Sequence, residues 1–241
     1  MTERPGPRDA HTVRVASYNV RAFKDDREAL VEVVRRIDPD VLLLQEAPRH
    51  PGSGHRVAAF AEQVGLAWAD GRRGRMSTTL LSSLRLDLLS CEHRNLPVGR
   101  REEPRGYAVA RLRLPGHLPF TAVSVHLSLR PAQRGPHVQQ ILRDIDAIGA
   151  AAAVLGGDLN ETYGEGAWRD LAVRMREVTG DVLTSPSGTP GKTIDGLLVS
   201  GPVGATVTRL DLDPLRLRMA TDHRPVYVDM DLTALADPAT P

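Results

Sequence analysis

The chain has 241 residues, of which 41% are hydrophobic and 25% are charged, so it can bury a sizeable core. Its 31 basic and 30 acidic residues leave a formal net charge of +1, which excludes a uniformly basic nucleic-acid-binding protein. The single cysteine, Cys91, excludes an intramolecular disulfide, and no apolar run is long enough to span a membrane. Met1–His11 lacks the apolar stretch of a signal peptide, so the expected location is the cytoplasm.

The first half of the chain predicts strands alternating with helices. Residues 13–20 alternate apolar and polar side chains, which indicates a strand, and Asp25 or Asp26 can cap a helix that ends near Ile37. The apolar run Val41–Leu44 predicts a strand buried on both faces. A helix over Val57–Val64 follows, and then four β-like runs at Thr78–Leu81, Leu84–Leu89, Tyr107–Leu114 and Phe120–His126.

The second half repeats this rhythm with more strands. Helical spacing predicts helices over Gln133–Gly149 and Ala167–Val173. Strands are expected at Ala152–Leu155, Ile194–Val199, Ala205–Leu210 and Val226–Leu232. Because strands dominate and residues 78–126 contain no predicted helix, we expect an α/β protein with two mainly antiparallel sheets packed face to face and helices outside.

Polar residues lie at the ends of the predicted strands. Strands end at Asn19, Glu46 and His126, while Asp158 and Asn160 follow Val154–Leu155 through an expected turn at Gly156-Gly157. The residues that instead lie at the starts of strands are Asp195, Asp222 and His223. If the last strands run antiparallel to the earlier ones, all these groups meet at one rim of the sandwich.

Such a rim suits phosphate-ester chemistry. A hard cation such as Mg²⁺ prefers carboxylate and amide oxygens, which makes Glu46 the best candidate ligand and Asn19 a neutral second one. Asp158 and Asn160 can position a water molecule, and two histidines can donate protons or hydrogen bonds to phosphoryl oxygens.

Each of these residues also has an ordinary structural explanation. Asp158 and Asn160 fit a turn, Glu46 fits the start of a loop, and His126 fits a core histidine with satisfied hydrogen bonds. The pair at 222–223 fits the cap of a turn. The sequence has no ligand cluster at zinc spacing, no Walker phosphate loop and no nucleophile elbow.

Together the segments resemble the endonuclease/exonuclease/phosphatase superfamily, which includes deoxyribonucleases and neutral sphingomyelinases. The matching stretches occur in the family's order, and they are Ser17–Val20, Asp40–Glu46, Val125–Leu127, Gly156–Asn160, Thr193–Asp195 and Thr221–Val226. The resemblance implies a four-layer α/β sandwich, with one domain over residues 12–233 between tails at 1–11 and 234–241. It also implies a phosphoric ester hydrolase that uses Mg²⁺, with Mn²⁺ as a substitute.

The resemblance also implies a role for each residue at the rim. The metal ligands would be Asn19, Glu46 and Asp222. The catalytic residues would be His126, Asp158, Asn160, Asp195, Asp222 and His223. In this assignment Asp195 orients His223 on the phosphate, and His126 marks the deoxyribonuclease-like and sphingomyelinase-like branches.

Two positions depart from the family pattern. Residue 21 is an arginine, where repair endonucleases carry an acid two residues after the asparagine. The run Gly71–Leu86, where the deoxyribonuclease branch would place an acid that orients its histidine, has no carboxylate. The nearest acids in sequence that can serve as the partner of His126 are Glu92, Glu102 and Glu103.

Three functions stay open from the sequence. The first is a phosphodiesterase or nuclease with DNA as a candidate substrate, in which case Arg72, Arg73 and Arg75 should meet phosphates. The second is a phosphatase or phospholipase-like esterase on a small or lipid phosphate. The third is an inactive member that binds nucleic acid or protein, and the intact set of candidate catalytic residues argues against it.

Overall fold

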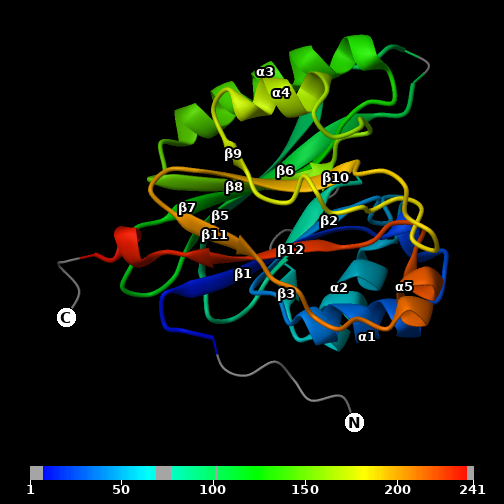
Figure 1. The fold of residues 1–241 in the computed structure, drawn as a ribbon, viewed down its shortest axis with the longest axis horizontal. Helices are drawn as coiled ribbons and strands as arrows, with labels where there is room; N and C mark the ends of the chain where they lie inside the picture. The colour runs from blue at the N-terminus through cyan, green and yellow to red at the C-terminus, as the bar shows by residue number, and fades with distance from the viewer. Residues whose placement is uncertain (1–7, 69–76, 101, 238–241) are drawn as a thin grey trace.

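The computed structural model describes residues 8–68, 77–100 and 102–237 of the chain. Within them, two six-stranded sheets pack face to face, and helices cover both outer surfaces (Figure 1). The predicted four-layer α/β sandwich is therefore confirmed.

The first sheet combines the N-terminal strands with the last strand of the chain. Its order is β11-β12-β1-β2-β4-β3, with β1 and β2 parallel and all other neighbours antiparallel. Its strands are β1 (Thr12–Asn19), β2 (Val41–Gln45), β3 (Ala67–Trp68), β4 (Thr79–Ser82), β11 (Gly204–Val207) and β12 (Val226–Asp231).

The second sheet also has one parallel pair of strands among antiparallel neighbours. Its order is β5-β6-β7-β8-β10-β9, and only β7 and β8 are parallel neighbours. Its strands are β5 (Asp87–Leu96), β6 (Arg105–Arg113), β7 (Phe120–His126), β8 (Ala152–Asp158), β9 (Arg176–Glu177) and β10 (Asp195–Ser200). Both sheets are thus mainly antiparallel, as the sequence predicts.

The helices divide between the two outer faces (Figure 1). The first sheet is covered by α1 (Arg27–Ile37), α2 (Gly54–Val64) and α5 (Pro214–Ala220), and the second by α3 (Pro131–Ile148) and α4 (Gly166–Ala172). Two short 3₁₀ turns are η1 (Arg21–Phe23) and η2 (Thr233–Leu235). In the described part of the chain, no helix combines the length and the apolar character needed to cross a membrane.

The helix α1 shows how the local sequence determines where a helix begins, where it ends and which face is buried. The Asp26 side chain accepts a hydrogen bond from the backbone N–H of Ala29, which satisfies one free donor of the first turn. Asp38, with φ of 52°, ends the helix in the left-handed region. The face turned to the sheet is buried and consists of Ala29, Leu30, Val33, Val34 and Ile37.

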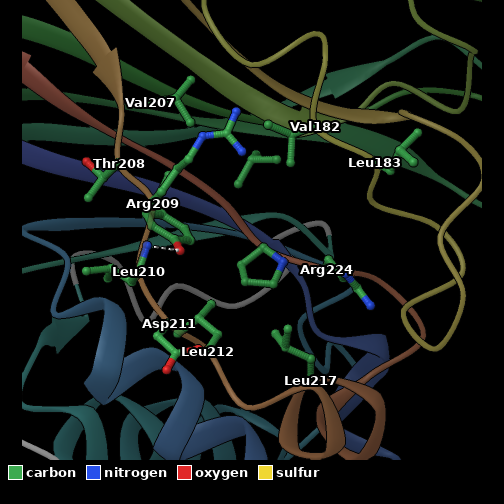
Figure 2. Close-up of a pocket in the computed structure, with 13 residues that line it drawn as sticks. Val182, Leu183, Val207, Thr208, Arg209, Leu210, Asp211, Leu212, Leu217 and Arg224 are labelled. Carbon is green, nitrogen blue, oxygen red and sulfur yellow. Dashed lines mark hydrogen bonds between the residues drawn. The ribbon is translucent and has the colours of Figure 1, made fainter.

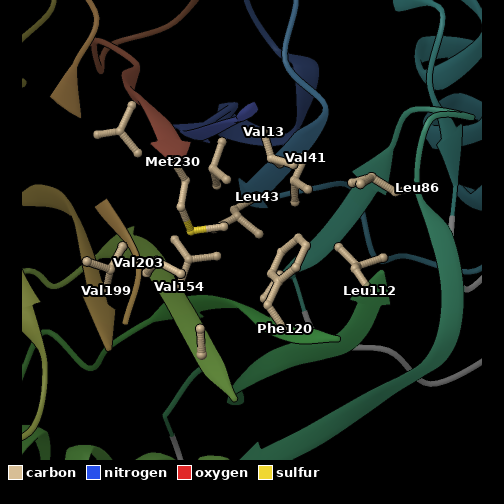
Figure 3. Close-up of a cluster of buried hydrophobic side chains, with 14 of the residues drawn as sticks. Val13, Val41, Leu43, Leu86, Leu112, Phe120, Val154, Val199, Val203 and Met230 are labelled. Carbon is tan, nitrogen blue, oxygen red and sulfur yellow. The ribbon is translucent and has the colours of Figure 1, made fainter. Parts of the chain in front are cut away.

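The layer between the two sheets is an aliphatic core (Figure 3). Leu43, Phe120 and Val154 are fully buried there, and side chains from both sheets meet. Truncation of a side chain such as Leu43 to alanine costs about 2–5 kcal/mol in cores of this kind. This layer therefore carries much of the stability that holds the rim residues in place.

One prediction about β8 is wrong. The sequence predicts a turn at Gly156-Gly157, but both glycines lie inside the strand. A Cβ atom at Gly157 would clash with the carbonyl oxygen of Val125, and one at Gly156 would lie 2.6 Å from Leu197 and 2.8 Å from Leu43. These glycines therefore serve close packing, on the neighbouring strand and across the two sheets, rather than a change of chain direction.

Edge elements differ most from the prediction. The strand expected at Leu84–Leu89 is β5, which begins at Asp87 and continues to Leu96, and its first four positions are exposed. The strand expected at Ala205–Leu210 is β11, which ends at Val207. Edge strands bury little, so they lack the apolar alternation that marks a strand in sequence. The helix α5, which is seven residues long, was not predicted.

Candidate active site

The strand directions bring the predicted polar residues to one rim. The strands β1, β2, β7 and β8 end there, while β10 and β12, which run antiparallel to β8 and β1, begin there. In the register of the second sheet, Asp158 lies opposite both His126 and Asp195. The arrangement expected for antiparallel last strands is thus observed.

Asn19 connects the two sheets at this rim. Its Nδ2 donates to Asp158 Oδ2 at 3.0 Å and to Glu46 Oε1 at 3.2 Å. Its Oδ1 accepts a hydrogen bond from the backbone N–H of Arg21 at 3.1 Å. A neutral amide donor between two carboxylates holds them side by side without adding charge.

Asp158 and Asn160 form a compact turn at the end of β8. Asp158 Oδ1 accepts from the backbone N–H of Asn160 at 2.9 Å, and Asn160 Nδ2 donates to the carbonyl oxygen of Leu127 at 3.0 Å. Asn160 has φ of 52°, a conformation that asparagine tolerates better than most residues. Burial raises the pKa of the Asp158 carboxyl, and the negative charge of Asp195 adds to this rise.

His223 is held by Asp195. Its Nδ1 lies 2.9 Å from Asp195 Oδ2 and 3.1 Å from Oδ1, and both side chains are nearly buried. Burial by itself lowers the pKa of His223, but the hydrogen bond and charge of Asp195 outweigh it and raise the pKa to about 9. The imidazole of His223 is therefore protonated at neutral pH, with Nε2 3.9 Å from Asp158 Oδ2.

The pKa of His126 is shifted in the opposite direction to that of His223. Burial lowers its pKa to about 4; the charge of Asp158 opposes this shift, while Arg105 and His223 add to it. Arg105 Nη1 lies 3.0 Å from Nδ1 and 3.1 Å from Nε2, so its N–H donates to whichever nitrogen is unprotonated. The 3.6 Å contact between His126 and Asp158 is therefore no ion pair at neutral pH.

The three glutamates proposed as partners of His126 have other partners. Glu92 pairs with Arg94, Glu102 with Arg130 and Gln133, and the Glu103 carboxylate lies 4.0 Å from Arg49. Besides Asp158, the side chain that contacts the ring nitrogens of His126 is the cation Arg105, at the start of β6. The sequence shows Arg105 only as one of a group with Arg100 and Arg101, and no local pattern distinguishes it.

Asp222 lies beside the arginine that departs from the family pattern. Its Oδ2 is 3.4 Å from Arg21 Nε, and its Oδ1 is 3.2 Å from the Thr221 hydroxyl. The Thr221 hydroxyl also donates to the carbonyl oxygen of Asn19 at 3.0 Å, which fixes this segment to the end of β1. A guanidinium thus lies beside the carboxylate that the sequence places among the metal ligands.

Two sets of donors in the described residues suit a metal ion. The first is the Glu46 carboxylate with the Asn19 side chain, an oxygen set that suits a hard cation. The second is Asp158, Asp195 and His223, whose ligand atoms lie within 4.8 Å of one another. A protonated histidine has no lone pair to offer a metal, so the first set fits Mg²⁺ better.

A cleft of about 650 Å³ opens next to these groups. Its lining includes Glu46, Arg105 and His126, so the candidate metal ligand and the neutral histidine face the same space. A separate pocket of about 320 Å³ lies beside β11 and α5 (Figure 2), but none of the predicted site residues lines it. The first cleft is therefore the candidate substrate site. The predicted phosphate-binding residues Arg72, Arg73 and Arg75 lie outside the described residues.

A family model matches most of the sequence. The model of the endonuclease/exonuclease/phosphatase family matches residues 16–223, from β1 to the second histidine of the site. No curated protein matches the chain in sequence.

Solved structures share the fold along nearly the whole chain. The endonuclease/exonuclease/phosphatase from Bacteroides vulgatus is 18% identical, with 92% of this chain and 99% of that chain covered and a TM-score of 0.67. A functionally unknown conserved protein from Enterococcus faecalis V583 is 18% identical, with coverage of 90% and 98% and a TM-score of 0.70. D. rerio TDP2, complexed with a single-strand DNA product, is 17% identical, with coverage of 91% and 99% and a TM-score of 0.68.

Proposed function

The chain belongs to the endonuclease/exonuclease/phosphatase family, and from this premise we propose that it is a magnesium-dependent phosphodiesterase. The observation that carries the proposal is that His126 and His223 lie 3.6 Å and 3.9 Å from the carboxylate of Asp158, next to the Glu46–Asn19 donor pair. Because D. rerio TDP2, which shares the fold, was solved with a single-strand DNA product, DNA is the first substrate to test.

Glu46 and Asn19 would hold the metal ion, and Mn²⁺ would serve in place of Mg²⁺. Asn19 Oδ1 accepts a hydrogen bond from the backbone N–H of Arg21, and its second lone pair would serve the metal. A bound divalent cation supplies positive charge against the phosphoryl oxygens. The role of Asp222 in this picture is to hold Arg21 at the rim, in addition to any direct contact with the metal.

Side chains at the rim orient the attacking water, bind the phosphate and donate a proton. Asp158 orients the attacking water through its carboxylate, and Asn160 binds a phosphoryl oxygen from the same turn. His223, protonated and fixed by Asp195, donates a proton or a hydrogen bond on one side of the phosphorus. On the other side, His126 accepts a proton or a hydrogen bond, and Arg105, which contacts His126, presents its remaining N–H groups to the phosphate.

The test is an activity panel with purified protein. Plasmid DNA, bis-p-nitrophenyl phosphate, sphingomyelin and inositol phosphates are each assayed with Mg²⁺, with Mn²⁺ and with EDTA. We expect metal-dependent hydrolysis of bis-p-nitrophenyl phosphate and of DNA. Hydrolysis of sphingomyelin or inositol phosphates alone would point to the small-substrate or lipid esterase, and no hydrolysis of any substrate would contradict the proposal.

A further inference from the structure

We propose that the cleft holds a second phosphate-binding site, formed by Lys24 and Arg49, and that the natural substrate carries at least two phosphate groups. This inference rests on the proposed function, because it takes the Glu46 end of the cleft as the place of the reacting phosphate. The cleft measures about 650 Å³, a size typical of ligand sites and larger than one phosphate group requires.

The charged side chains that line the cleft differ in the contacts they make. Arg105 and Glu46 belong to the reacting end, where they contact His126 and Asn19. Lys24 and Arg49 line the same cleft, and Lys24 forms no ion pair within the described residues. Both side chains are cations in a concave site that would hold an anionic substrate. A phosphate that flanks the reacting one would bind to these two cations.

Arg49 has one carboxylate nearby, and it is a weak competitor. Glu103 Oε2 lies 4.0 Å from Arg49 Nη2, and the Glu103 side chain is 79% exposed. Exposed pairs of this kind contribute little to stability, less than a charge-assisted contact to a phosphate. A phosphate would therefore displace Glu103 from Arg49.

The backbone fixes both cations close to the reacting end. Lys24 follows η1, which is tied to the metal-ligand loop because Ala22 N–H donates to the carbonyl oxygen of Glu46 at 2.7 Å. Arg49 is three residues after Glu46, so its Cα lies within about 11 Å of the Glu46 Cα. Because this distance is an upper limit, the two sites are close enough to be bridged by neighbouring phosphates of one strand, whose axial spacing is about 3.4 Å.

The apolar residues that line the cleft suit the uncharged part of such a substrate. The cleft is also lined by Pro48, Pro51 and Leu129, and the Leu129 side chain is 68% exposed although it is apolar. A cleft with apolar lining beside two cationic sites fits a short nucleic-acid strand better than a simple monoester.

The experiment compares substrates with one and with two phosphates. With Mg²⁺ present, kcat and KM are measured on bis-p-nitrophenyl phosphate, on TpT and on the trinucleotide TpTpT for Lys24→Gln, Arg49→Gln and the double variant. Arg143→Gln, an exposed arginine on α3 away from the cleft, is the matched control. We expect the KM for TpTpT relative to that for TpT to rise about tenfold or more for each cation removed, as loss of one charge-assisted contact predicts.

A binding measurement keeps the inference testable even if the protein hydrolyses none of these substrates. Fluorescence anisotropy of labelled TpTpT, with inositol 1,4-bisphosphate as competitor, distinguishes a nucleotide from a small polyphosphate as the source of the second phosphate. Weaker binding of either ligand by the Lys24 and Arg49 variants supports the second site. Equal effects on TpT and TpTpT, or values matching Arg143→Gln, would overturn it, and in that case metal-dependent hydrolysis of bis-p-nitrophenyl phosphate would still support the proposed function.

Discussion

The pair of His223 and Asp195 gives the site a measurable electrostatic signature. The pKa of His223 is raised from an ordinary 6.5 to about 9, and the partner carboxylate is 1% exposed. At about 1.4 kcal/mol per pKa unit, a shift of this size corresponds to about 3 kcal/mol. Asp195→Asn keeps an oxygen acceptor of the same shape and removes the charge, so we predict that most of this contribution is lost.

The pH at which the loss is visible follows from the direction of the shift. Because the pKa of His223 is raised in the folded protein, its stabilisation is fully present below pH 6.5 and disappears as the pH rises through 9. The free energy of unfolding of the unmodified protein, measured with urea in EDTA, should therefore fall by up to about 3 kcal/mol between pH 6.5 and 10 relative to that of Asp195→Asn.

The control for this prediction is Asp181→Asn. Asp181 lies 3.8 Å from Arg209 and is 73% exposed, so its removal should leave the pH profile parallel to that of the unmodified protein. An NMR titration of His223 gives the same information directly. Parallel stability profiles for the unmodified protein and Asp195→Asn, or a His223 pKa near 6.5 in the unmodified protein, would refute the electrostatic argument.

Three further predictions address the metal, the acid–base groups and the packing. Glu46→Gln removes one ligand charge and should weaken Mg²⁺ affinity by orders of magnitude in a metal titration of activity; full activity at unchanged Mg²⁺ would exclude Glu46 from the site. His126→Ala and His223→Ala should each lower kcat by about 10²–10⁴-fold, with a double variant that is less than additive; normal turnover in both would contradict the mechanism. Gly156→Ala places a Cβ 2.6 Å from Leu197 and should cost about 1–3 kcal/mol in urea unfolding, whereas unchanged stability would contradict the packing argument.

The fold and the rim were predictable because strand ends can be read from local patterns. Val41–Leu44 and Phe120–His126 are short buried runs, and a polar residue directly at such an end has to lie at the sheet's edge. The positions of Glu46 and His126 at one rim then follow from strand direction alone. Packing of the apolar faces leaves few other arrangements for such strands.

The contacts between rim residues were not predictable in the same way. Arg105 reaches His126 because β6 pairs with β7 in a register that sets Tyr107 opposite Val125, which no local pattern specifies. Arg21 reaches Asp222, 201 positions later, because residues 21–23 all have positive φ, at 42°, 56° and 54°, without a glycine to indicate it. Pairing at this range depends on tertiary structure rather than on propensity.

The two glycines of β8 also determine which parts of the molecule can move. Gly156 lets Leu43 and Ser17 of the facing sheet pack directly against the β8 backbone, and Asn19 bonds to Asp158 across the same gap. A hinge motion that widened the rim would break these contacts and expose the core, so opening and closing of the two sheets is disfavoured. Motion during turnover is therefore restricted to loops and substrate, and amide hydrogens of β1, β2 and β8 should exchange equally slowly with and without a bound nucleotide.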